Sequence, residues 1–122
     1  MAIQRIETNR RMSQAVKAGS TVYIAGQLAY ESGGETGGAD VARQMEEILG
    51  RVDRLLAEFG GDRTSLVSAT LWLEDIGDYD RINAVWDAWV PDGHAPARAC
   101  VQAKLAMAGY RVEMAAVAVV AV

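Results

Sequence analysis

The chain has 122 residues, 51% hydrophobic and 23% charged, which fits one compact domain over residues 1–122 and is too short for two. No stretch has the roughly 18 to 20 apolar residues that span a bilayer, and the first residues lack the apolar run of a signal peptide, so we expect a cytoplasmic protein with no membrane partner. The net charge of -4 opposes the phosphate neutralisation that dominates nucleic-acid binding, so no nucleic-acid partner is expected.

The N-terminal part is predicted to form three strands followed by a loop. Ile3–Thr8 is the first strand candidate. Gln14–Ala18 and Thr21–Ala25 are β-prone runs, and Gly19-Ser20 between them predicts a tight hairpin. Four glycines in the segment 31–38 then predict a mobile loop.

Two amphipathic helices follow, with a strand between them. From Asp40 to Phe59, apolar residues recur at three- and four-residue spacing, and Asp40 is placed to cap the start. A second helix is predicted to begin at Asp78 and to end before Pro91. Between the helices, Ser65–Leu73 alternates two kinds of side chain, the pattern of a strand with two different faces.

The last two strand candidates are Ala97–Leu105 and Arg111–Val122, with Ala106–Gly109 predicted to join them in a hairpin. The order β-β-β-α-β-α-β-β predicts an α+β domain with two helices packed on one face of a mixed sheet. The other face must then meet water or another subunit, and symmetric self-association would cover it. We expect that face to carry these side chains: Ser68, Thr70, Trp72, Arg98, Cys100 and Gln102.

The last two strands also carry the side chains most suited to chemistry. Arg98 and Cys100 share one face of a strand, because alternate residues point the same way. If the predicted hairpin pairs Leu105 with Tyr110, the Glu113 carboxylate lies on that same face, diagonal to the sulfur. A slip by one residue would move Glu113 to the opposite face.

Two interpretations of this trio remain open. Arg98 offers a planar charged fork for a carboxylate, Glu113 could orient or deprotonate a water, and Cys100 could be a nucleophile or a pocket wall. Alternatively, Arg98 and Glu113 form a cross-strand ion pair, and Cys100 is a small buried hydrophobe. Spacing alone favours the second interpretation, since cross-strand charge pairs are common.

Four segments keep a characteristic order and spacing from about Met12 to the C-terminus: QAVKAGSTVYIAGQ, INAVWDAW, PARACVQAKL and RVEMAAVAV. They resemble the RidA/YjgF family of reactive-intermediate deaminases. The resemblance implies a chorismate-mutase-like α+β fold that assembles into a homotrimer, with active sites in the clefts between subunits.

The resemblance also implies roles for single residues. Arg98 matches the arginine that holds the substrate carboxylate, and Cys100 matches the cysteine that lines the same pocket. Glu113 matches the glutamate that positions the attacking water. Asn83 matches the asparagine that members of the family carry near the cleft, early in the second helix.

A second substrate-facing segment departs from the family pattern. Gly26 matches the glycine whose backbone faces the substrate, and Gln27 completes that segment. Ala25 stands in place of a serine, and Met12 stands in place of a tyrosine that many deaminating members have. Both departures remove hydroxyls near the substrate, so substrate range and rate are the properties they affect.

The implied reaction is hydrolysis of a 2-imino acid, or its enamine tautomer, to a 2-keto acid and ammonia, without a metal or organic cofactor. Because an imine carbon is already electrophilic, such a site need only hold the carboxylate, exclude competing nucleophiles and place one water. The missing hydroxyls leave open a non-catalytic protein that binds or senses a small carboxylate. Ribonuclease activity, sometimes attached to this family's name, has no support in a sequence with neither a basic stripe nor a histidine pair.

Overall fold

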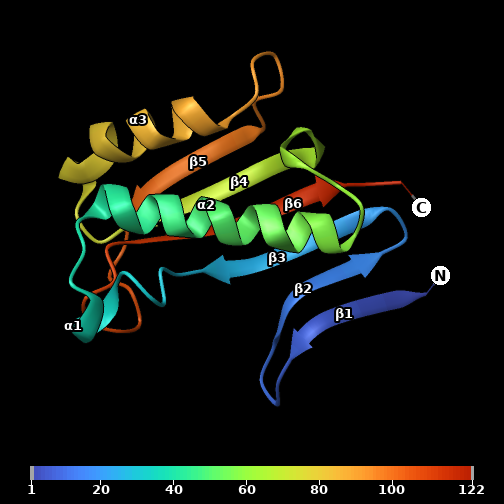
Figure 1. Ribbon diagram of the computed structural model, residues 1–122, viewed down its shortest axis with the longest axis horizontal. Coiled ribbons are helices and arrows are strands. Elements are labelled where there is room, and N and C mark those ends of the chain that lie inside the picture. Colours follow the sequence, from blue (N-terminus) through green and yellow to red (C-terminus); the bar gives the residue numbers. More distant parts are fainter. Residues whose placement is uncertain (1, 122) are drawn as a thin grey trace.

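The computed structural model describes residues 2–121 as a mixed six-stranded sheet with two long helices on one face (Figure 1). The predicted order of elements and the α+β class are confirmed. The strands are β1 Ile3–Thr8, β2 Ser13–Ala18, β3 Thr21–Gln27, β4 Leu66–Leu73, β5 Ala97–Gln102 and β6 Val112–Val119. The helices are α1 Gly34–Gly37, α2 Val41–Glu58 and α3 Tyr79–Trp89, with single 3-10 turns at Arg63–Ser65 and Ile76–Asp78.

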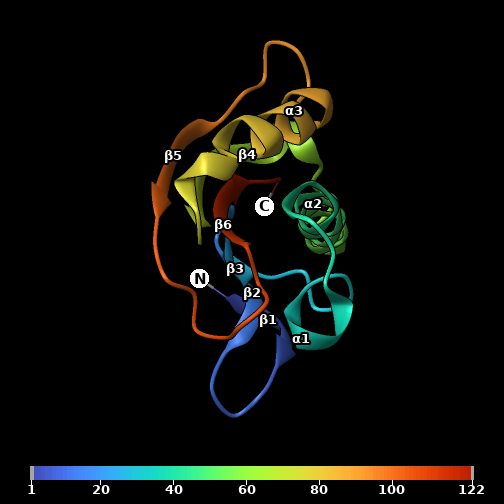
Figure 2. The ribbon, with the colours of Figure 1, turned by 90° about the vertical axis from the view of Figure 1, so that its left-hand side faces the viewer.

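The capping residue and apolar spacing in the sequence correctly predicted the long helices. Asp40 caps α2 as predicted, its carboxylate accepting a hydrogen bond of 2.9 Å from the Arg43 N–H. The apolar stripe of α2 is fully buried against β3 and β6, and Figure 2 shows α2 and α3 on the same side of the sheet. The glycine-rich segment contains the short helix α1, and the last strand ends at Val119, while Val122 lies outside the described residues. None of the helices described between residues 2 and 121 is long and apolar enough to cross a membrane.

The predicted hairpin between the last two strands is wrong. The sheet order is β1-β2-β3-β6-β4-β5, so β4 lies between β5 and β6. β4 pairs parallel with β5, which it reaches through α3, and antiparallel with β6. The physical reason is burial: Leu71 and Leu73 of β4 are fully buried, and a central position satisfies the backbone of this apolar strand on both edges.

The sheet face away from the helices is rich in exposed apolar side chains. Ser68, Thr70 and Trp72 lie on this face as predicted, because Leu71 and Leu73 point toward the helices. Four large apolar residues are also about half exposed: Tyr23, Val67, Val101 and Val119. Patches of this kind mark surfaces that contact other molecules.

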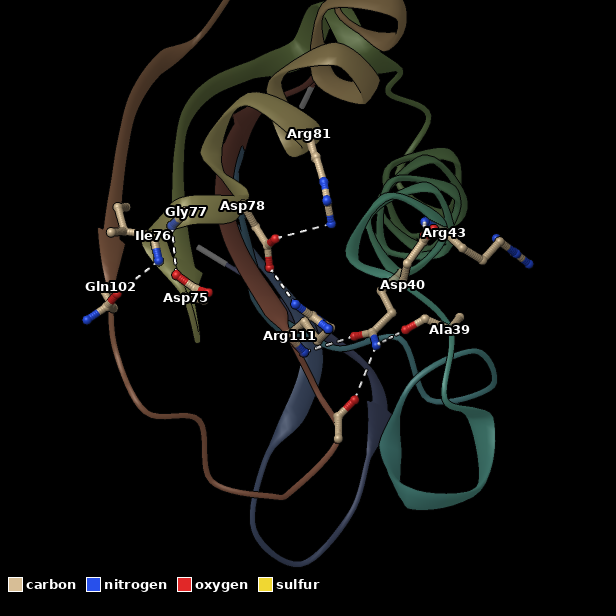
Figure 3. Close-up of polar contacts among 12 residues, drawn as sticks. Ala39, Asp40, Arg43, Asp75, Ile76, Gly77, Asp78, Arg81, Gln102 and Arg111 are labelled. Carbon is tan, nitrogen blue, oxygen red and sulfur yellow. Dashed lines mark hydrogen bonds and ion pairs between the residues drawn. The ribbon is translucent and has the colours of Figure 1, made fainter.

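A buried glutamine ties the start of α2 to the segment that leads into β6. Gln44 Nε2 donates to the carbonyls of Ala39 and Gly109 at 3.0 and 3.2 Å, and its Oε1 accepts from the Arg111 N–H at 2.9 Å. The Arg111 guanidinium donates in turn to the buried carboxylate of Asp78 at 3.0 Å (Figure 3). These bonds hold the long connection between β5 and β6 against both helices.

Replacing Gln44 with alanine should therefore destabilise the fold strongly. The change leaves a cavity and removes the partner of three backbone groups, so we expect a loss of about 2–4 kcal/mol. Gln4→Ala, on exposed β1, is the matched control and should change stability by less than about 0.5 kcal/mol. Urea unfolding at one fixed protein concentration measures both, and equal stabilities of the two variants would contradict the structural role given to Gln44.

Candidate active site

Arg98 lies on the edge strand β5 and reaches over the first turns of α3. Its Nη2 donates to Asn83 Oδ1 at 2.7 Å and to the Tyr79 hydroxyl at 3.2 Å. The guanidinium also lies over the rings of Trp86 and Tyr79, 5.2 and 5.6 Å from their centroids. No carboxylate pairs with Arg98 among residues 2–121. A positioned arginine whose charge has no internal partner is suited to bind an external anion.

Cys100 lies two residues along the same strand face, half-buried at the margin of the core. Burial raises the pKa of the Cys100 thiol above its ordinary value, and the nearby Arg98 charge offsets only part of that rise. The group is therefore a neutral thiol at neutral pH. A thiol in this state is a poor nucleophile, which favours the interpretation of Cys100 as a pocket wall.

Cys100→Ser should accordingly keep most of any activity. We expect kcat within about threefold of the wild type, since only the loss of a thiolate nucleophile would cost several orders of magnitude. The measurement is steady-state hydrolysis of a 2-imino acid, together with the rate of alkylation by iodoacetamide in the wild type. Complete loss of turnover in Cys100→Ser would restore the sulfur as nucleophile.

Glu113 lies on β6, on the sheet face turned away from the helices, because its neighbours Val112 and Met114 are buried in the core. It pairs with Trp72 on β4, and burial raises the pKa of its carboxyl above the ordinary value. A Cβ on Gly26 would overlap Glu113 Oε2, so any larger residue there would force this carboxylate to move. Gly26 and Glu113 thus form one half of the candidate site.

The predicted arrangement of the trio on one face is wrong. Arg98, Cys100 and Gln102 pair with Ala69, Leu71 and Leu73, the residues of β4 that point toward the helices. Glu113 pairs with Trp72, which points the other way. With β4 between their strands, Arg98 and Glu113 of one chain lie on opposite faces of the sheet, so the cross-strand ion pair considered from the sequence is also absent. The site residues therefore form two groups within one chain.

The remaining predicted residues lie on the N-terminal strands. Gln27 is fully buried, with its amide bonded to Gln14, to the Ala25 carbonyl and to Arg51, so its side chain serves the fold. Ala25 lies half-buried beside Gly26. Met12 lies in the turn before β2 and lines a groove of about 740 Å³ with Tyr30 and Met107.

Tyr79 and Trp86 were missed as site residues. Their spacing to Asn83, four residues before and three after, puts all three on one face of α3, and this signal was present in the sequence. Both aromatic residues also fit the apolar spacing of an amphipathic helix, which is the more common reason for such residues at these positions. The structure gives them a second role, because both rings also contact the Arg98 guanidinium.

Comparison with known proteins places the chain among related sequences and structures. A sequence model of the family described as Endoribonuclease L-PSP matches residues 2–120. The chain is 38% identical to the RutC family protein YoaB of Escherichia coli, over 98% of this chain and all of that protein. It is 33% identical to 2-iminobutanoate/2-iminopropanoate deaminase of Rattus norvegicus, over 88% of this chain and 78% of that protein.

Solved structures agree in fold. NMB1025 of Neisseria meningitidis, a member of the YjgF protein family, superimposes with a TM-score of 0.89 at 41% identity, covering 98% of this chain and 96% of that one. The mixed sheet with two covering helices thus defines an α+β protein of the YjgF class. The chain belongs to the YjgF/RidA family, whose model carries the name Endoribonuclease L-PSP.

Proposed function

We propose that the protein hydrolyses 2-imino acids, or their enamine tautomers, to 2-keto acids and ammonia, with no metal or organic cofactor. The observation that carries this proposal is Arg98: Asn83 and two aromatic rings position it, and its charge has no carboxylate partner among the described residues. Such a group fits the carboxylate that all 2-imino acids share. The likeness to a named iminobutanoate deaminase supports the proposed reaction class.

The proposed site needs two copies of the chain. Arg98 and Glu113 lie on opposite faces of one sheet, so a single chain cannot bring both to one small substrate. We propose a homotrimer in which Arg98, Asn83 and Cys100 of one copy face Glu113 and Gly26 of the next. The exposed apolar residues on the open sheet face supply the surface that such an assembly would bury. Met12 and Ala25 would border the substrate from the Gly26 side.

The proposed chemistry requires one water and one base. Glu113 accepts a proton from the water while the water oxygen bonds to the carbon of the protonated imine, and the C=N π electrons move to nitrogen to give a neutral carbinolamine. Glu113 then returns this proton to the amine nitrogen, the C–N bond breaks as the hydroxyl oxygen forms the C=O of the keto acid, and the hydroxyl proton leaves with ammonia as ammonium. Burial raises the pKa of Glu113, which brings its basicity closer to that of an effective general base at neutral pH. Arg98 contributes by fixing the carboxylate, so that the imine carbon faces the water.

A direct assay tests this function. An amino-acid oxidase generates the 2-imino acid in place, semicarbazide traps it, and the protein competes with the trap for the imine. We expect less semicarbazone and faster release of keto acid and ammonia when the protein is present. Unchanged semicarbazone formation at micromolar protein would refute the deaminase.

The alternative is a non-catalytic protein that uses the same interfacial site to bind or sense a keto acid. It is favoured by the two positions where the family's hydroxyls are missing, Met12 and Ala25. Saturable binding of 2-oxobutanoate without turnover would favour this alternative.

We do not propose ribonuclease action despite the family's printed name, because the chain is acidic and its sole histidine, His94, lies exposed in a loop. We propose a cytoplasmic location, which fits a chain whose single cysteine, Cys100, is a free thiol.

A further inference from the structure

The Tyr79 hydroxyl is one of two groups that accept hydrogen bonds from the same nitrogen of Arg98. Arg98 Nη2 donates to Asn83 Oδ1 at 2.7 Å and to the Tyr79 hydroxyl at 3.2 Å, which engages both of its hydrogens. The remaining donors, on Nε and Nη1, have no partner among residues 2–121. Tyr79 is 41% exposed, so a ligand that approaches Arg98 from solvent can reach its hydroxyl.

The geometry of a guanidinium gives this contact a consequence. A carboxylate binds an arginine most strongly through two parallel hydrogen bonds, and each two-donor edge of the guanidinium includes Nη2. Because Asn83 and Tyr79 together use both Nη2 hydrogens, a carboxylate that binds by either edge must displace or share one of these acceptors. Tyr79 holds the longer of the two bonds, and its acceptor is a hydroxyl that can turn.

We propose that Tyr79 is a substrate-binding residue whose hydroxyl changes partner when the carboxylate arrives. In the free protein its oxygen accepts from Arg98 Nη2. When a carboxylate docks on the arginine, the hydroxyl gives up that bond and donates its own proton to a carboxylate oxygen. This inference rests on the proposed 2-imino acid site and deepens it, because it makes the carboxylate contact a three-residue clamp of Arg98, Asn83 and Tyr79.

Tyr79 supplies a hydroxyl to a site that lacks the two hydroxyls of the family pattern. Met12 and Ala25 remove hydroxyls on the Gly26 side of the site, whereas Tyr79 supplies one on the Arg98 side. A carboxylate keeps its charge throughout hydrolysis of the imine, so a hydrogen bond to it is equally strong before and during reaction. Such uniform binding lowers KM and leaves kcat unchanged.

Tyr79→Phe tests the hydroxyl alone, because the ring stays over Arg98. We expect the KM for the imino acid and the Kd for 2-oxobutanoate, measured by calorimetry, each to rise about tenfold, with kcat within twofold. The matched control is Tyr110→Phe, since Tyr110 lies in the connection between β5 and β6 and has no part in the proposed site, and it should match the wild type in both. Thermal unfolding of each variant verifies that the fold is intact.

The outcomes separate this inference from the proposed function. A Kd in Tyr79→Phe within twofold of the wild type overturns the role of Tyr79, even if the wild type hydrolyses imines. Binding of 2-oxobutanoate without hydrolysis overturns the deaminase, and the Kd of Tyr79→Phe then decides the clamp by itself. A wild type that neither binds nor hydrolyses overturns both. A fall in kcat with unchanged KM would also overturn the clamp, since it would indicate a role in the chemical step.

Discussion

Arg98→Ala should abolish acceleration of imino-acid hydrolysis, with kcat/KM falling at least about 100-fold. The substitution removes the positive charge that we propose holds the substrate carboxylate, and a charge-assisted bidentate contact of this kind is among the strongest a protein makes. Without it, the imine carbon is no longer held against the proposed water, so the advantage of positioning is lost together with affinity. Binding of 2-oxobutanoate should weaken by a similar factor.

Semicarbazone competition and calorimetry measure these two losses. Arg43→Ala is the matched control, because it also removes one positive charge, from an exposed position on α2. Size-exclusion chromatography should give the same assembly for wild type and both variants. An Arg98→Ala protein that hydrolyses imines at the wild-type rate would remove the residue on which both the deaminase and the binding-protein interpretation depend.

The sequence predicted the elements of this fold but not all of their neighbours. Helix α2 was predictable to within a residue, because its apolar period and the cap at Asp40 are local properties of the chain. Pairing of the last two strands was not, since a short segment between them is compatible with a hairpin as well as with a crossing to the far side of β4. What decided the matter was the burial of β4, which β5 and β6 flank on its two edges, and this burial is a property of the whole chain.

The sequence likewise indicated the residues of the candidate site but not their arrangement in space. Family resemblance pointed to Arg98, Asn83, Gly26 and Glu113, and the structure puts the first two in direct contact and the last two against each other. The error in strand pairing carried over to the relation between the two pairs of residues. The expected register of the last two strands puts Arg98 and Glu113 on one face, whereas their actual pairings with β4 put them on opposite faces. Two groups on opposite faces make the assembly part of the proposed site.

Glu113→Gln should reduce kcat about 100-fold with little change in KM, because the amide keeps the shape but cannot accept the proton of the attacking water. Burial raises the pKa of Glu113, so wild-type activity should fall with decreasing pH at a higher pH than an ordinary glutamate would give. In Glu113→Gln, the remaining activity should not show this fall at acidic pH. The measurement is kcat from pH 4 to 8, corrected for the uncatalysed hydrolysis of the imine.

Unlike its activity, the thermal stability of Glu113→Gln should not fall below that of the wild type at neutral pH. A carboxyl whose pKa is raised by folding favours the folded state while it is protonated, and that contribution is lost as pH rises through the raised pKa. At pH 7 to 8, Glu113→Gln should therefore melt no lower than the wild type. Glu46→Gln, exposed on α2, is the control and should leave both activity and melting unchanged. A variant that melts lower and loses activity in parallel would make Glu113 a structural residue, whereas lower activity in an equally stable protein is what a proton acceptor requires.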